Sequence, residues 1–213
     1  MPRTQGMWIV KLGGSLLGSL ELQHWLDVIT ALGDGKVIVV PGGGVFSDAV
    51  RSAQQLSGID DASAHKLALR AMDQFGLLLA AMNSNLTTAS SELELAERSW
   101  QHRAIVWLPS KMVLADESIA QTWKVTSDSL SAWLANKLGA EQLVLVKSAS
   151  LTDYQSSVTF EKLANDNIVD ASFAQFAEAK SYAIRIFNKA DFNSFKQALK
   201  QKSMHEKGLL LGA

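Results

Sequence analysis

The sequence has no cysteine, only 3 prolines and no excess of either charge. Without cysteine the chain can form no disulfide, thiol nucleophile or thiolate metal site, and this composition fits a reducing compartment. We therefore expect a cytoplasmic protein. The 20 basic and 21 acidic residues give a net charge of -1, so the basic excess typical of non-specific nucleic-acid or anionic-membrane binding is missing. Any phosphate that the chain binds must be held locally.

Long apolar runs are also missing. The run at 7–10 is shorter than the apolar core of a signal peptide, and the run at 77–82 is too short to cross a bilayer. We expect neither a membrane partner nor a nucleic-acid partner. No metal site is expected either, because metal-ligand spacing is absent among the four histidines, His24, His65, His102 and His205.

What the sequence does contain is enough apolar surface for a core. Of its 213 residues, 47% are apolar and 19% are charged, and there is no extended polar tract. The closest approach to low complexity is the short Ser/Thr-rich stretch at 87–91. Burial on this scale offsets chain entropy, and the length allows one α/β domain or two small lobes that share a core.

Glycine residues follow two early apolar runs. The run at 8–12 is closed by Gly13 and Gly14, and the run at 36–40 is closed by Pro41 and the glycines at 42–44. Both are typical of buried strands that end in glycine-rich turns, and helical spacing at 20–32 separates them.

Strands and helices alternate along the rest of the chain. This order predicts a mostly parallel sheet covered by helices on both faces. We expect helices over 47–56, 62–86, 126–138 and 191–202, and strands over 104–108, 143–147, 181–187 and 209–211.

The two glycine turns are candidate anion sites. Ligands of open α/β sheets bind at the carboxyl ends of strands, where helix N-termini offer N–H groups and glycine lets a phosphate approach closely. Known phosphate fingerprints do not fit, since Ser19 and Leu20 stand where a P-loop needs Lys and Ser/Thr, and no Gly-x-Gly-x-x-Gly is present. A Walker NTPase and a plain dehydrogenase are therefore disfavoured.

Charged residues accompany the turns. Lys11 precedes Gly13 by two residues, which suits phosphoryl transfer, although a lysine at a strand end can equally be solvated. Asp128 falls in the first turn of the helix at 126–138, where an acid also serves simple helix capping.

Three segments together resemble the amino acid kinase family, whose members include acetylglutamate kinase, UMP kinase and isopentenyl phosphate kinase. They occur in matching order and spacing, and the resemblance covers roughly residues 7 to 150. The segments are Val10-Lys-Leu-Gly-Gly-Ser, Val40-Pro-Gly-Gly-Gly, and Thr126-Ser-Asp-Ser with Ala132 and Ala135 on the helix that follows.

The resemblance implies an open three-layer αβα sandwich that transfers the γ-phosphoryl group of ATP, supplied with Mg²⁺, to a carboxylate or phosphate. It implies one domain over 1–213, with an acceptor-binding part at about 1–120 and a nucleotide-binding part at about 121–213, and a homo-oligomer. By the same resemblance, Lys11 contacts the transferring phosphoryl group and Asp128 orients the active-site lysines. The resemblance also implies that the ATP phosphates are bound by Gly13, Gly14, Ser15 and Ser127, and that the acceptor is bound by Gly42, Gly43 and Gly44.

Two family features are missing. An Asp-x-Asp-Gly stretch is expected after the strand at 143–147, where this chain has Lys147-Ser-Ala-Ser, and a Gly-Gly-Met-x-x-Lys segment with a second catalytic lysine is absent. We offer Lys147 as the substitute cation, the alternative being an ordinary surface lysine.

Three further residues are candidates for the acceptor site. Arg51 suits a bidentate contact with an acceptor phosphate, and His65 and Asp73, eight residues apart, suit recognition of its ammonium or phosphate. Solvated or packed roles remain open for each. Trp107, Trp123 and Trp133 could stack on an aromatic ring or simply pack.

Within the family, the chain looks most similar to the short aminomethylfuranylmethyl phosphate kinases of methanofuran biosynthesis, a part of one-carbon metabolism. We therefore expect conversion of that monophosphate to its diphosphate. Two alternatives stay open. One is a kinase for another acceptor, such as an amino acid carboxylate, UMP or isopentenyl phosphate, and the other is a non-catalytic nucleotide-binding or oxyanion-binding protein of the same fold.

Overall fold

A computed structural model describes residues 6–155, 157–177, 182–201 and 208–211. Within this part of the chain, seven strands form one sheet in the order β3-β4-β2-β1-β5-β6-β7, and every neighbouring pair is parallel except β6 and β7. The mostly parallel sheet predicted from the sequence is confirmed. The strands are β1 Trp8–Leu12, β2 Val37–Pro41, β3 Leu86–Ala89, β4 Ala104–Trp107, β5 Gln142–Lys147, β6 Ala183–Asn188 and β7 Leu209–Leu211.

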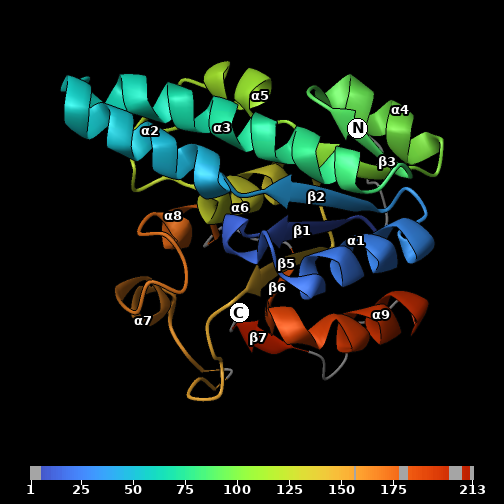
Figure 1. Ribbon diagram of the computed structural model, residues 1–213. Helices are drawn as coiled ribbons and strands as arrows, with labels where there is room; N and C mark the ends of the chain where they lie inside the picture. The colour runs from blue at the N-terminus through green and yellow to red at the C-terminus, as the bar shows by residue number, and fades with distance from the viewer. Residues whose placement is uncertain (1–5, 156, 178–181, 202–207, 212–213) are drawn as a thin grey trace.

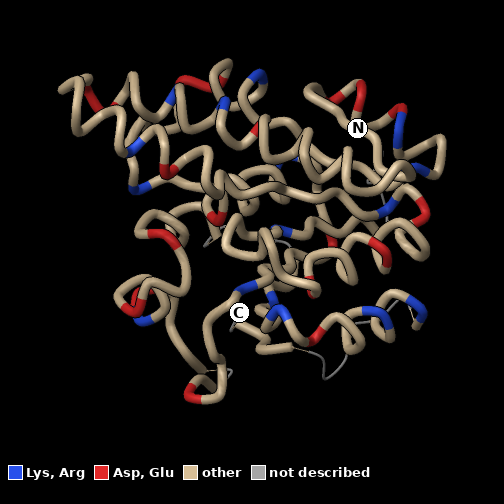
Figure 2. The backbone as a smooth tube through the Cα atoms, viewed as in Figure 1, with Lys and Arg blue, Asp and Glu red and all other residues tan. Residues whose placement is uncertain are grey.

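Helices cover both faces of the sheet (Figure 1). Helices α1 (Leu20–Leu32) and α9 (Phe192–Gln201) pack on one face. Helices α6 (Ser127–Leu138) and α8 (Phe173–Ala177) lie on the opposite face. This arrangement confirms the three-layer αβα class. Figure 2 shows acidic and basic residues mixed along the chain, as the near-zero net charge suggests.

A long helix pair lies beside the sheet and borders its carboxyl edge. Helix α2 (Gly44–Ser57) begins directly at the second glycine turn, and α3 (Asp61–Met82) runs back alongside it (Figure 1). Helix α2 buries none of its side chains fully, so its polar face is left to line a cavity. The remaining short elements are η1 Gly14–Leu16, α4 Glu92–Trp100, α5 Ser110–Leu114, α7 Phe160–Asn165 and η2 Lys189–Asp191.

The sheet order reverses between β1 and β5. The chain builds β2, β4 and β3 on one side of β1 and then returns, through α6, to place β5 on the other side. Ligands of such sheets bind at the point of reversal, outside the carboxyl ends of the strands. The turn after β1 and the end of β5 therefore mark the expected site.

One sequence prediction was wrong around residue 86. The helix expected over 62–86 ends at Met82, and Leu86 begins edge strand β3, which α4 follows. Asn83 stops the helix in an extended conformation, and its side chain accepts from the backbone N–H of Asn85 at 3.1 Å. Ser91, which we had grouped with a Ser/Thr-rich stretch, caps α4.

The other boundaries shift by a few residues. The helix expected at 47–56 starts earlier, at Gly44, and short α5 was not predicted. The last helix begins at Phe192 after a 3-10 turn. Residues 181 and 202, included in the predicted strand and helix, lie outside the described part of the chain. Among the described helices, none combines the length and the apolar character that a membrane span requires.

Candidate active site

The two glycine turns touch each other. A Cβ built on Gly14 would lie 2.1 Å from the Cα of Gly44, and a Cβ on Gly42 would lie 2.6 Å from the amide nitrogen of Gly14. Gly42 N–H also donates to the carbonyl of Leu12 at 2.9 Å. Parallel pairing of β1 and β2 brings their carboxyl ends together, and the absence of side chains lets the bends approach this closely.

Helix α2 opens from this contact without a side-chain cap. Its N-cap residue, Gly43, offers no side-chain acceptor, and Gly44 has a positive φ of 53°. The first N–H groups of a helix lack intrahelical partners, and the helix dipole favours negative charge there. The start of this 14-residue helix is therefore suited to an oxyanion.

Lys11, Asp128 and Lys147 form a buried ion cluster. Lys147 Nζ donates to both carboxylate oxygens of Asp128, at 2.7 Å each, and Lys11 Nζ lies 3.0 Å from Oδ1 of the same carboxylate. The side chains are 8%, 7% and 12% exposed for Lys11, Asp128 and Lys147. Two ammonium groups on one carboxylate leave one unit of positive charge uncompensated.

Strand register explains how the lysines meet. Lys11 pairs with Leu145 across β1 and β5, and Lys147 is two residues further along β5. Side chains two apart on a strand share a face, so Lys11 and Lys147 project toward the face covered by α6. Asp128 occupies the first turn of that helix.

Burial and charge oppose each other in this cluster. Burial alone raises the pKa of Asp128, but the ammonium groups of Lys11 and Lys147 outweigh it and hold that pKa at about 2. Burial lowers the pKa of Lys147 to about 8, with help from Lys11 and against the attraction of Asp128. At neutral pH the carboxylate is therefore fully ionised.

The start of α6 is held by a residue that the sequence analysis did not single out. Asp170 accepts from the N–H and hydroxyl of Thr126, at 3.0 and 2.8 Å, and from the N–H of Ser129 at 2.9 Å, and the Ser129 hydroxyl also donates to it. Asp170 thus acts as the N-terminal cap that the side chain of Thr126 itself does not provide. Asp170 is 44 residues from Thr126 along the chain, so no local sequence pattern marks it as a cap.

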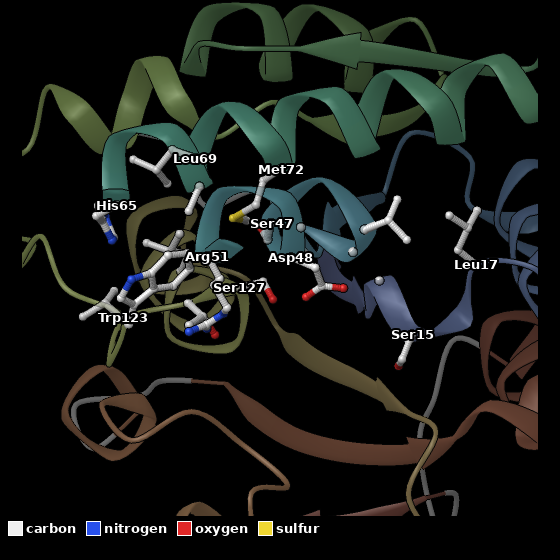
Figure 3. A pocket seen from close by; sticks show the side chains of 18 residues that line it. Ser15, Leu17, Ser47, Asp48, Arg51, His65, Leu69, Met72, Trp123 and Ser127 are labelled. Carbon is white, nitrogen blue, oxygen red and sulfur yellow. The ribbon is translucent and has the colours of Figure 1, made fainter. Parts of the chain in front are cut away.

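A cavity of about 500 Å³ opens beside the glycine turns (Figure 3). Ser15 lies at one end of its wall, and His65 and Trp123 lie at the other. Gly14 also lines the cavity. Its remaining lining residues come mainly from α2, α3 and the start of α6: Leu17, Gly43, Gly44, Val45, Ser47, Asp48, Arg51, Ala68, Leu69, Met72, Val125, Thr126, Ser127 and Leu130.

The cavity combines residues to which we had assigned different roles. Ser127, expected on ATP, lines the same wall as Arg51. Trp123 and the residues after it come from the predicted nucleotide-binding part, so the cavity crosses the boundary at about residue 120. That division of the chain stays a prediction.

Arg51 and Trp123 are held together in the cavity wall. The guanidinium carbon of Arg51 lies 3.7 Å from the centre of the Trp123 ring, and the indole N–H of Trp123 donates to Gln54 at 2.6 Å. One face of the Trp123 ring is therefore covered by the guanidinium group of Arg51. The other two tryptophans pack instead, since Trp107 is fully buried and stacks on Trp133 at 5.9 Å.

Asp73 is not part of the cavity wall, which corrects our expectation. Its carboxylate accepts from the backbone N–H of Ser110 at 3.1 Å and from the Ser110 hydroxyl, and it lies 3.6 Å from Arg70. It therefore tethers the start of α5. Residues eight apart on a helix differ by about 80° around the axis. Asp73 therefore does not lie on the helix face that His65 presents to the cavity.

Polar contacts link the chain at the carboxyl ends of β1, β5 and β6. The hydroxyls of Ser15 and Ser148 lie 3.0 Å apart, and the Asn188 amide donates to the Ala149 carbonyl at 2.9 Å. These contacts join the segments that follow β1, β5 and β6. Ser15 and Ser148 are exposed, and Ser148 directly follows Lys147 along the chain.

The described residues include no group of three or more carboxylate or imidazole side chains placed to hold a metal ion. Both oxygens of Asp128 are engaged by ammonium groups. A bound Mg²⁺ is usually held by one or two carboxylates together with substrate phosphates and water. The part played by Mg²⁺ therefore stays a prediction.

Comparisons with known proteins agree with this geometry. The model of the amino acid kinase family matches residues 6–151. A curated relative, the (5-(aminomethyl)furan-3-yl)methyl phosphate kinase of Methanocaldococcus jannaschii, is 29% identical over 140 residues, which are 65% of this chain. The matched segment spans 64% of that relative's length.

Solved structures share the fold. Uridylate kinase from Archaeoglobus fulgidus superposes with a TM-score of 0.69 at 16% identity, covering 96% of this chain and 97% of its own. UMP kinase from Bacillus anthracis gives 0.68 at 14% identity, covering 97% and 99%. At these identities the likeness establishes the αβα fold and not the substrate.

Proposed function

The chain belongs to the amino acid kinase family, and from this premise we propose that it transfers the γ-phosphoryl group of ATP to an oxyanion held in the cavity. The observation that carries the proposal is the pair of buried lysines on Asp128, next to two glycine turns that touch. Phosphoryl transfer needs positioning and stabilisation of negative charge, and this arrangement concentrates both at one point.

Each group has a distinct task in this proposal. Lys11 and Lys147 neutralise charge on the transferring phosphoryl group, and Asp128 keeps both ammonium groups in place. Gly13, Gly14 and Ser15 face the phosphates of ATP. The acceptor oxyanion lies on the other side of the lysines, at the turn formed by Gly42, Gly43 and Gly44 and at the first N–H groups of α2.

No general base is needed. A phosphate or carboxylate acceptor is already an oxyanion at neutral pH, so in-line placement and charge neutralisation suffice. Mg²⁺ bound to the ATP phosphates would neutralise further charge there. The side chains of this chain then have to hold the two substrates in line and exclude water between them.

We propose an aminomethylfuranylmethyl phosphate as the acceptor. The name of the curated relative supports this choice, because it specifies a phosphate at one end of a small ring and an aminomethyl group at the other. The cavity suits such a molecule, since its wall carries both an acidic residue, Asp48, and a basic one, Arg51, beyond the glycine turns. Homo-oligomerisation and a cytoplasmic location also stay predictions.

The proposal is tested by offering Mg·ATP and a panel of acceptors to the purified chain. The panel holds the aminomethylfuran phosphate, UMP, isopentenyl phosphate, aspartate and acetylglutamate, and ³¹P NMR identifies the products. We expect ADP and a furan diphosphate, with no product from a Lys11→Met variant. If another acceptor of the panel gives the product instead, that acceptor replaces the furan phosphate in the proposal. If calorimetry shows ATP binding but no acceptor yields ADP, the result favours a non-catalytic binding protein.

A further inference from the structure

His65 sits almost completely buried at one end of the cavity. Its side chain comes from α3, the residue is 3% exposed, and Figure 3 shows its ring beside Trp123. A buried imidazole on a cavity wall has two ring nitrogens that must each find a partner. Among the described residues, the protein supplies a partner for one nitrogen only.

The partner that is present fixes where the proton lies. Nδ1 of His65 is 3.0 Å from the carbonyl oxygen of Thr122. A carbonyl oxygen can only accept, so Nδ1 carries the hydrogen and donates it. Burial lowers the pKa of His65, although the Thr122 contact partly opposes this, so the ring is neutral near pH 7. Its other nitrogen, Nε2, is then unprotonated and can only accept.

Nε2 is buried and has no hydrogen-bond partner within the part of the chain that the structure describes. An unsatisfied buried polar atom is costly and calls for an explanation, such as a group supplied by a ligand. Because Nε2 is an acceptor, a phosphate or carboxylate without hydrogens cannot satisfy it. A donor can do so, and an ammonium group is a strong one.

Resting on the proposed function, we propose that His65 recognises the ammonium group of the acceptor, with Nε2 accepting its hydrogen bond while the phosphate end lies at the start of α2. The charged side chains on the α2 wall are Asp48 and Arg51, one of each sign. They offset each other, and the guanidinium of Arg51 already lies on Trp123. Discrimination at this end therefore depends on the hydrogen bond to His65 more than on net charge.

The first test reads the imidazole directly and does not depend on catalysis. Long-range ¹H–¹⁵N NMR of the full chain at pH 7.5 distinguishes protonated from unprotonated ring nitrogens, and a His65→Gln variant assigns the resonance. We expect a neutral ring protonated on Nδ1. Titration with the aminomethylfuran phosphate should then shift Nε2, whereas the analogue with methyl in place of aminomethyl should not. A ring protonated on Nε2 would overturn the proposal.

The second test measures selectivity. Wild type should use the aminomethyl acceptor with a kcat/KM about 10²-fold above that of the methyl analogue, because the analogue leaves Nε2 unsatisfied. His65→Leu should lose most of this preference, His65→Gln should keep part of it through its amide oxygen, and the exposed His102→Leu control should keep it all. Equal preference in wild type and a folded His65→Leu would overturn the assignment.

The two tests separate this inference from the proposed function. If no furan phosphate is a substrate, the proposed acceptor fails, yet the NMR experiment still decides whether Nε2 is an unpaired acceptor and whether an amine satisfies it. O-Phosphoethanolamine and ethyl phosphate serve as simple probes in that case. A shift of Nε2 with the amine alone supports donor recognition, and equal responses to both probes contradict it.

Discussion

Lys147 donates to both carboxylate oxygens of Asp128, although the two residues come from different elements, the end of β5 and the first turn of α6. The contact places a second ammonium group beside Lys11 without the lysine-bearing segment that family members commonly carry. This chain can therefore place two ammonium groups on one carboxylate although it lacks that segment.

Lys147→Met should lower kcat by about 10²–10³-fold, because it removes charge that acts mainly in the transition state. The KM for ATP should change much less. Steady-state kinetics with Lys162→Met as the matched control measures this, since Lys162 also pairs with an aspartate but is exposed. Unchanged kcat in folded Lys147→Met would remove Lys147 from the mechanism.

Asp128→Asn should both slow turnover and destabilise the fold. Without the carboxylate two buried ammonium groups face each other uncompensated, and breaking a buried ion pair costs about 3–5 kcal/mol. Urea unfolding reports the loss of free energy. Glu92→Gln is the control, because its half-exposed pair with Lys137 should contribute only about 0–1 kcal/mol. Similar losses in both variants would contradict a buried cluster.

The pH dependence of kcat/KM should follow Lys147. Burial holds the pKa of this lysine at about 8 in the free protein, below the ordinary value of 10.5, so its ammonium form is lost as pH rises through about 8. Since the charged form is the active one and kcat/KM reports the free enzyme, kcat/KM should fall on the alkaline side. Lys147→Arg, if it retains activity, should lose that limb because a guanidinium stays charged. A flat wild-type profile from pH 7 to 10 would be inconsistent with this assignment.

Gly14→Ala should disrupt the site where the two turns touch. The added Cβ would fall 2.1 Å from the Cα of Gly44, so one bend must move and kcat/KM should drop by at least about 10²-fold. Gly58→Ala is the control. Its φ is positive at 70° but its surroundings are open, so it should cost about 1–2 kcal/mol of stability with normal kinetics.

Asp170→Asn should weaken the start of α6. It exchanges charge-assisted hydrogen bonds from Thr126 and Ser129 for weaker ones, which should cost about 1–3 kcal/mol in urea unfolding. Because Asp128 sits on the same turn, kcat should fall with the KM values less affected. A variant as stable as wild type would show that Asp170 does not cap the helix.

The sequence predicted the parts of the molecule that strong local signals define. Glycine after two apolar runs located the bends at Gly14 and Gly44, and the register of parallel strands then brought Lys11 near Lys147. Edge strand β3 was missed because its middle residues, Thr87 and Thr88, are polar and only half buried, so they lack an apolar run. Partners distant in sequence, such as Asp170, leave no local pattern.

The central claim is that a phosphoryl group passes beside the buried lysines at the touching turns. A crystal structure with a non-hydrolysable ATP analogue, Mg²⁺ and the aminomethylfuran phosphate tests it most directly. The account predicts the γ-phosphoryl group within hydrogen-bonding distance of the ammonium groups of Lys11 and Lys147, with the acceptor phosphate at Gly44. A γ-phosphoryl group bound elsewhere, with both lysines still directed only at Asp128, would contradict it.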